Sequence, residues 1–318
     1  MSTQRAERAK CVSPFQVCLL AIAAGLPLCG CGHDRRGDTV TVACVGDVML
    51  GRGVSRACKE HGDNYPFEAV GELLREPDIT FGNLECPLAQ GQVRFARVNA
   101  LYAAPQMAQA LAKAGFDVLG LANNHAVDCG RPGLLETIET LQAAGIAPVG
   151  VGSTAMQAQE GAVLTVKGRR FGFIAFSDFP KANFVHDPDR ASILMLTEDN
   201  LRDVLPPLRS SCDHLVVSFH WGKEGSAETS SHERRLAHLA VQMGADLVVG
   251  HHAHVRGQIE RLGGSLICYC LGNFVFDQDS YGGNEGLVVL CTFDRQGLIA
   301  HRAIPTRVVD CQARIDQF

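Results

Sequence analysis

The chain has 318 residues, enough for one large α/β domain or two small ones, and 46% of them are hydrophobic. Its formal net charge of -5 at pH 7 excludes the basic excess typical of nucleic-acid-binding proteins, so we expect no nucleic-acid partner. Nine of its thirteen cysteines lie after residue 31 without any Cys-x-x-Cys pair, and we expect most of these to be buried as small apolar residues.

The first thirty residues have the pattern of a signal peptide. A basic start precedes an apolar run, 17–29, that is too short to cross a bilayer comfortably as a helix. The run ends in Leu-Cys-Gly-Cys, which resembles a bacterial lipobox in which Cys31 would be lipidated. Cys29 stands where Ala or Ser is usual, and a plain secretory signal is the alternative. In either case we expect the chain to be exported to the cell envelope. A lipidated Cys31 would anchor it to the periplasmic or extracellular face of a membrane.

From residue 39 onward, strand and helix patterns alternate. The expected strands are 39–45, 78–81, 116–121, 162–166, 170–176, 215–219 and 246–250. The expected helices are 68–75, 105–114, 132–144, 198–210 and 233–243. Because no linker interrupts the later part, we predict a signal peptide (1–30), a linker (31–38) and a single α/β domain (39–318).

Potential metal ligands follow the ends of five apolar strand patterns. These ligands are Asp47, Glu85, Asn124 with His125, His220, and His252 with His254. Sites in α/β sheets form beyond the carboxyl ends of strands, so we expect these side chains to converge. Carboxylate, amide and imidazole donors together suit Mn, Fe, Zn or Mg, and a shared carboxylate can bridge two ions. The sequence therefore predicts a site for one or two divalent ions.

The densest group of ligands follows Gly250, where three imidazoles, His251, His252 and His254, lie within four residues. Glycine allows a sharp turn at a strand end, and neutral imidazole is the commonest metal ligand. A solvated polar loop is the alternative. The spacing His-His-x-His directly after an apolar strand favours metal binding.

The order of these motifs resembles the calcineurin-like metallophosphoesterase superfamily, whose pattern is GDxH, GDxxD, GNH, a lone His and GHxH. The chain resembles the CapA family of poly-γ-glutamate capsule synthesis more closely. Six colinear segments carry this resemblance: 46–49, 83–85, 122–125, 220–224, 250–255 and 271–278. The resemblance implies a metallophosphatase-like four-layer sandwich, in which two mixed β-sheets are flanked by helices.

The resemblance also implies roles for individual residues. Asp47 and His254 would bind one ion, Glu85 would bridge, and Asn124, His220 and His252 would bind the second ion. His125, beside Asn124, holds the position of the general acid that protonates the leaving oxygen in phosphoesterases, where the two cations activate the attacking water.

Two positions depart from the phosphoesterase pattern. Met49 stands where those enzymes have His, and a thioether is a poor partner for Mn or Mg, so the site of Asp47 would lose a donor. Glu85 replaces the usual bridging Asp and lengthens the carboxylate by one methylene. Both departures resemble the CapA pattern.

Several neighbouring residues have two interpretations each. His251, Trp221 and Glu224 could support the ligands or contact a substrate, while Trp221 could equally be a core aromatic and His251 a loop residue. Asp128 could orient His125 or form an Asx turn. Asn273 is expected to make structural hydrogen bonds in its loop.

Three functions remain open at this stage. The first is biosynthesis, export or anchoring of a poly-γ-glutamate-like capsule polymer, with an anionic polymer and capsule-synthesis membrane proteins as partners. The second is a secreted dinuclear-metal phosphoesterase acting on phosphate esters. The third is a non-catalytic polymer-binding assembly protein, which Met49 motivates. The sequence does not decide whether the chain is an enzyme, but we favour a metal-dependent hydrolase of the metallophosphoesterase type.

Overall fold

The first β-sheet is parallel in one half and antiparallel in the other. The computed structural model describes residues 38–90, 101–179, 189–277 and 283–316, so the expected signal peptide and Cys31 lie outside the described residues. The strand order is β16-β15-β14-β1-β2-β3-β4, with β13 parallel to β1. The strands are β1 (Val40–Val48), β2 (Ile79–Leu84), β3 (Val118–Gly120), β4 (Ala147–Val149), β13 (Asn273–Val275), β14 (Glu285–Phe293), β15 (Leu298–Val309) and β16 (Gln312–Ile315).

The second sheet has the order β11-β12-β10-β9-β7-β6. Its four inner strands are parallel, and the edge strands β6 and β11 are antiparallel to their neighbours. The strands are β6 (Ala162–Val166), β7 (Arg169–Ser177), β9 (His214–His220), β10 (Leu247–His251), β11 (Ile259–Leu262) and β12 (Ser265–Cys268). A small antiparallel pair is formed by β5 (Val151–Gly152) and β8 (Ser192–Ile193).

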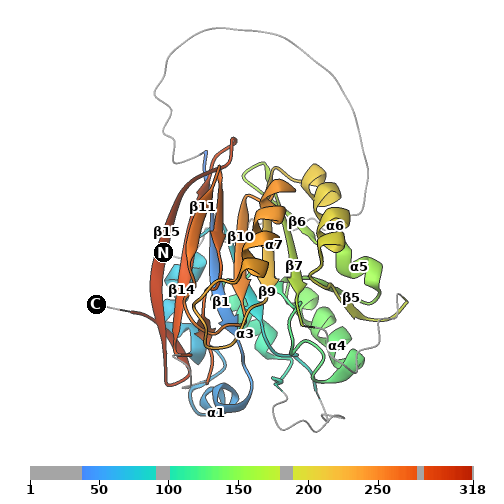
Figure 1. The fold of residues 1–318 in the computed structure, drawn as a ribbon. Helices are drawn as coiled ribbons and strands as arrows, with labels where there is room; N and C mark the ends of the chain where they lie inside the picture. Colours follow the sequence, from blue (N-terminus) through green and yellow to red (C-terminus); the bar gives the residue numbers. More distant parts are fainter. Residues whose placement is uncertain (1–37, 91–100, 180–188, 278–282, 317–318) are drawn as a thin grey trace. The chain divides into compact units, whose positions relative to one another are not determined.

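Helices cover the outer faces of both sheets (Figure 1). The larger apolar core fills the space between the sheets, where the rings of Phe81 and Phe173 stack at 6.0 Å, and extends under α1–α4. A second core joins the other sheet to α5–α7. The helices are α1 (Arg52–His61), η2 (Tyr65–Val70), α2 (Gly71–Arg75), α3 (Met107–Ala114), α4 (Gly130–Ala143), α5 (Ala155–Glu160), α6 (Glu198–Ser211) and α7 (Ser231–Gln242). The expected sandwich of two mixed sheets flanked by helices is confirmed.

Local capping explains where the two helices over the second sheet begin. Thr197 accepts a hydrogen bond from the amide of Asn200 at the start of α6. Ser230 and Glu233 form a reciprocal capping box at the start of α7, so this helix begins two residues before the expected 233. No helix among the described residues is long and apolar enough to span a membrane.

Nine cysteines lie among the described residues. Seven of these nine are buried, and Cys129 and Cys311 are partly buried. Burial raises the pKa of the buried Cys86 and Cys291 thiols to about 12, so both stay protonated at neutral pH. The expectation that most cysteines act as small apolar residues is confirmed.

A histidine is buried in the inter-sheet core at the opposite end of β9 from the proposed ligand His220. His214 packs against Phe171 and Phe293, with ring centroids 4.8 Å and 5.0 Å apart, and neither ring nitrogen has a well-aligned hydrogen bond. Burial lowers the pKa of His214, although the nearby carboxylate of Asp246 acts in the opposite direction. The folded state therefore resists protonation of this ring more than the unfolded state does.

Acid should destabilise the fold through His214. With a folded pKa below the unfolded value of about 6.5, its contribution to stability is complete above that pH and is lost as the pH falls below it. We expect His214→Phe to gain stability relative to the wild type as the pH falls from about 7 to about 5, by up to ~1.4 kcal/mol per pH unit. Urea titrations of both proteins across this range measure the difference, and parallel pH profiles would contradict it.

Candidate metal centre

The carboxyl ends of four parallel strands bring the proposed ligands together. Strand pairing sets Asp47 of β1 beside Asn83 of β2, and His220 of β9 beside His251 of β10. Glu85 follows β2 directly, and its backbone amide donates to the carbonyl of Val48 at 2.9 Å. The convergence predicted from the strand ends is therefore observed, with ligands contributed by both sheets.

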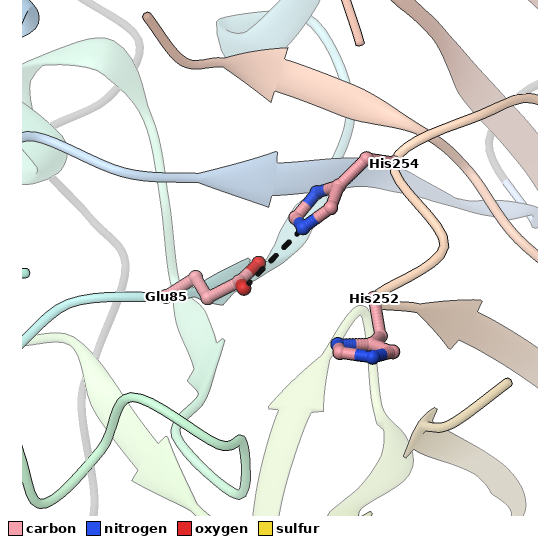
Figure 2. A group of neighbouring side chains, drawn as sticks. All are labelled: Glu85, His252 and His254. Atoms are coloured by element: carbon pink, nitrogen blue, oxygen red, sulfur yellow. Dashed lines mark ion pairs between the residues drawn. The ribbon is translucent and has the colours of Figure 1, made fainter. Parts of the chain in front are cut away.

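Glu85 is the clearest indication of a cation site. Its side chain is fully buried, and neither carboxylate oxygen has a hydrogen-bond partner in the protein. Its Oε1 lies 3.8 Å from Nε2 of His254, 3.9 Å from Nε2 of His220 and 4.0 Å from Nε2 of His125. Figure 2 shows the carboxylate facing His254, with His252 on the same loop. A buried carboxylate that is surrounded by imidazole nitrogens but receives no hydrogen bond has the environment of a metal ligand.

Burial and the nearby charge of Asp47 raise the pKa of Glu85 well above its ordinary value. Burial also raises the pKa of Asp47, but the imidazoles of His251 and His254 outweigh it and hold that pKa well below its ordinary value. The two carboxylates thus differ in how far protein groups offset their negative charge. Asp47 is paired with imidazoles of the protein, whereas neither carboxylate oxygen of Glu85 receives a hydrogen bond.

The loop after β10 holds His252 and His254 in unusual backbone conformations. Their φ angles are 89° and 58°, in the left-handed region that residues with a Cβ seldom adopt. The amide of His252 donates to Oδ2 of Asp47 at 3.1 Å, which ties the loop to β1. Before them, Gly250 approaches Tyr269 so closely that a Cβ would lie 1.9 Å from its carbonyl oxygen. Such strain persists where the surrounding structure enforces it and is typical of functional sites.

His220, Asn124 and His252 form one tight cluster. Nε2 of His220 lies 2.8 Å from Oδ1 of Asn124 and 3.1 Å from Nδ1 of His252. Burial and the neighbouring His252 hold the pKa of His220 well below its ordinary value, and burial and His254 lower the pKa of His252 to about 4. Both rings are therefore neutral near pH 7, which is the form that binds metal.

His254 presents one ring nitrogen to the centre. Its Nδ1 lies 2.8 Å from Oδ1 of Asn273, an acceptor that fixes the proton on Nδ1 and directs Nε2 toward Glu85. Burial lowers the pKa of His254, but Glu85 and Asp47 outweigh this effect and raise it to about 10. In the metal-free protein a proton on His254 therefore partly replaces the cation, and a bound ion would displace that proton. The sequence predicts structural hydrogen bonds for Asn273 in a loop, but this residue begins β13 and its bond to His254 supports a proposed ligand.

The ligand atoms fall into two overlapping groups, each within 4.8 Å. One contains Glu85, His252 and His254, and the other contains Asp47, Glu85 and His220. Both groups include Glu85, the residue that the sequence resemblance places between two ions. Here His252 groups with His254, and Asp47 groups with His220. The sequence assignment instead places Asp47 with His254 and His220 with His252. The donor set nevertheless supports a divalent metal in this cluster.

His125 is oriented as a proton carrier beside this cluster. Its Nδ1 lies 2.7 Å from Oδ2 of Asp128, which also accepts the amide of Leu101 at 2.8 Å. Its Nε2 points to Glu85, and its side chain is 20% exposed, so a substrate could reach it. Of the two interpretations of Asp128, the structure supports the one in which it orients His125.

Residues 41–278, a range that contains every proposed ligand, match the family model described as bacterial capsule synthesis protein PGA_cap. The chain belongs to this family. It is 32% identical over 252 residues to the capsule biosynthesis protein CapA of Bacillus anthracis, covering 77% of this chain and 61% of that protein. It is 30% identical over 245 residues to the PGA biosynthesis protein CapA of Bacillus subtilis, covering 76% and 64%. The chain spans about three-fifths of the length of these relatives.

Two solved structures share the fold. A hypothetical protein from Thermus thermophilus has a TM-score of 0.56 and 19% identity, covering 84% of this chain and 98% of that chain. A 5′-nucleotidase precursor from the same organism has a TM-score of 0.52 and 15% identity, covering 87% and 54%. At these identities the likeness concerns the fold alone. The expected membership of the CapA-like family with a metallophosphatase fold is thus confirmed.

Two residues that the sequence places near the site, Met49 and Trp221, form hydrogen bonds with the backbone. The Met49 sulfur is buried and accepts the amide of Gly51 at 3.0 Å, so it is already engaged. Trp221 is 1% exposed and donates to the carbonyl of Tyr269 at 2.9 Å. Trp221 therefore packs as a core aromatic, which is one of its two interpretations.

The other two supporting residues named from sequence lie near the centre. His251 is fully buried, with Nδ1 3.1 Å from Oδ1 of Asp47 but poorly aligned for a hydrogen bond. Glu224 is exposed, yet its charge helps to raise the pKa of Glu85, after burial and Asp47. His251 therefore contacts a proposed ligand, and Glu224 lies within electrostatic range of the centre.

Sequence reasoning missed three residues that contact the site of this PGA_cap protein. The Phe179 ring lies 3.9 Å from the ring of His252, measured between centroids, and covers one side of it. Asn83 and Asn123 are buried amides that link the ligands. Asn83 and Asn123 each lie within a motif segment, but only the three-dimensional pairing shows where their side chains point.

Proposed function

We propose that this PGA_cap protein takes part in making, exporting or anchoring a poly-γ-glutamate-like capsule polymer through a divalent metal centre. The ligands proposed are Asp47, Glu85, Asn124, His220, His252 and His254. The observation that carries the proposal is the match over 41–278, because it includes the whole buried cluster around the unpartnered Glu85. The names of the Bacillus relatives support the capsule polymer as the substrate class.

The donors favour a transition metal within the expected set. Three imidazoles, from His220, His252 and His254, supply nitrogen ligands, which suit Mn, Fe or Zn better than the oxygen-seeking Mg. A bound ion of this kind would polarise an acyl or phosphoryl oxygen and stabilise charge that develops on it. We therefore infer Mn, Fe or Zn as the resident metal.

His125, oriented by Asp128, can supply a proton during bond cleavage. Asp128 accepts from Nδ1 of His125, which leaves Nε2 to give a proton to a leaving amine or alkoxide oxygen. Hydrolysis of an acyl or phosphoryl bond in the polymer or its precursor is the reaction that this geometry supports.

A binding and turnover assay tests this function. The Mn²⁺-loaded protein is expected to retain γ-linked glutamate oligomers more tightly than α-linked oligomers of the same length and charge. The α-linked oligomers serve as the matched control, since they carry the same number of carboxylates on a different backbone. Equal retention of both, together with rapid hydrolysis of p-nitrophenyl phosphate, would favour the phosphoesterase function instead.

We further propose that the protein is exported and anchored by lipid on Cys31, beside membrane proteins of capsule synthesis. The support is the basic start, the short apolar run and the lipobox-like end of residues 1–31. Cys31→Ser is expected to move the protein from the membrane fraction to the soluble fraction, because one residue carries the acyl chains. Unchanged fractionation would contradict the anchor.

A further inference from the structure

A buried amide lies between proposed ligands that come from different sheets. Asn83 of β2 is 2% exposed, and its Nδ2 donates to Oδ1 of Asp47 at 2.8 Å. The same nitrogen lies 3.4 Å from Nδ1 of His220, which belongs to the second sheet. One side chain therefore contacts a carboxylate ligand of β1 and an imidazole ligand of β9.

A second buried amide extends this contact to the loop after β3. Asn123 is fully buried, and its Nδ2 donates to Oδ1 of Asn83 at 3.1 Å and to the carbonyl of Leu84 at 2.8 Å. Its own Oδ1 accepts the backbone amide of His125 at 3.1 Å. Hydrogen bonds thus run without a break from Asp47, through two amides, to the backbone of the proposed proton donor.

We infer that Asn83 is a positioning residue that fixes Asp47 against the rest of the metal centre and transmits this order through Asn123. The inference rests on the proposed metal centre. The side chain at this position must both donate to Asp47 and accept from Asn123, and an amide does both. A carboxylate here would set two acceptors against each other, and an alkyl group would leave buried polar atoms without partners.

The position of Asp47 shows what Asn83 adds. Oδ1 of Asp47 receives Asn83 and lies near His251, while Oδ2 receives the amide of His252. These donors fix the plane of the carboxylate. The lone pair of Oδ2 that remains available for a metal therefore points in one fixed direction. Removing Asn83 would free Oδ1 and allow the carboxylate to rotate. Such supporting hydrogen bonds typically contribute about 10–100-fold to metal affinity.

Metal titrations of three variants test the inference. We expect Asn83→Ala to weaken Mn²⁺ binding by about 10–100-fold and to change the visible absorption of the Co²⁺-loaded protein. Asn123→Ala should weaken binding less, because Asp47 keeps its donor. The double variant should bind about as weakly as Asn83→Ala alone, since Asn123 acts through Asn83. Gln312→Ala is the matched control, because this buried amide donates to the carbonyl of Tyr65 at 2.8 Å outside the centre.

The outcomes separate this inference from the proposed centre itself. Failure of the wild type to bind Mn²⁺ would overturn the centre. Tight binding by the wild type with unchanged affinity in Asn83→Ala would overturn the role of Asn83 only. If Asn83→Ala does not fold, Asn123→Ala decides the question, and an affinity equal to that of Gln312→Ala would contradict the inference.

Discussion

Replacing both His252 and His254 with alanine is expected to abolish stoichiometric metal binding. The two imidazoles contribute two of the three ligands in one candidate group, and His252 also lies 3.1 Å from His220 in the other cluster. Alanine offers no donor atom in place of either ring. Elemental analysis after dialysis against Mn²⁺ should find metal in the wild type and only background in the variant.

The same change removes the stabilisation that metal gives to the fold. A ligand present at about 100 times its dissociation constant adds about 2.7 kcal/mol to the free energy of unfolding, and the double variant should gain nothing. His301→Ala is the matched control, since His301 is an exposed residue of β15. Stoichiometric metal in the double variant would show that the ligand assignment is wrong.

Glu85→Gln is expected to reverse the order of stability between variant and wild type when metal is added. Without metal, the wild type buries a carboxylate that has no hydrogen-bond donor, and glutamine removes its charge at nearly constant shape. The metal-free variant should therefore be at least as stable as the wild type. With Mn²⁺ the wild type should gain about 2–3 kcal/mol, whereas the variant loses the shared ligand and gains little.

Urea unfolding of both proteins, with Mn²⁺ and with a chelator, measures this reversal. Glu260→Gln is the control, because Glu260 pairs with Arg234 and accepts from Tyr269 through ordinary hydrogen bonds. It should be destabilised by a similar amount in both conditions. A Glu85→Gln protein that is strongly destabilised without metal would mean that Glu85 has a structural partner after all.

The convergence of the ligands could be predicted because it depends on a simple rule of strand direction. Parallel strands β1, β2, β9 and β10 end at the same side of their sheets, so residues just past those ends must meet. The sequence marks such ends by a change from apolar to polar residues. Asp47, Glu85 and His220 are predicted in this way.

Side-chain direction is harder to predict from motifs. Trp221 directly follows β9 and packs in the second core, whereas His220, the last residue of β9, contacts another proposed ligand. A motif that contains both residues does not distinguish these two directions. The helix α1 escapes prediction for another reason, since Val54 and Cys58 are its only buried residues.

The amide links lie beyond sequence reasoning. Asn83 and Asn123 are 40 residues apart, and nothing in composition shows that their side chains meet. Their contact depends on the register of β2 with β3, which pairs Asn83 with Gly120. A register shift of one residue would turn Asn83 to the other face of the sheet.

A crystal of the protein soaked in Mn²⁺ would test the metal centre most directly. The account predicts an anomalous scattering peak within about 2.0–2.4 Å of a carboxylate oxygen of Glu85, with imidazole nitrogens of His252 and His254 or of His220 completing the ligands. A fully soaked crystal without a peak at Glu85, and with its carboxylate still unpartnered, would contradict the account.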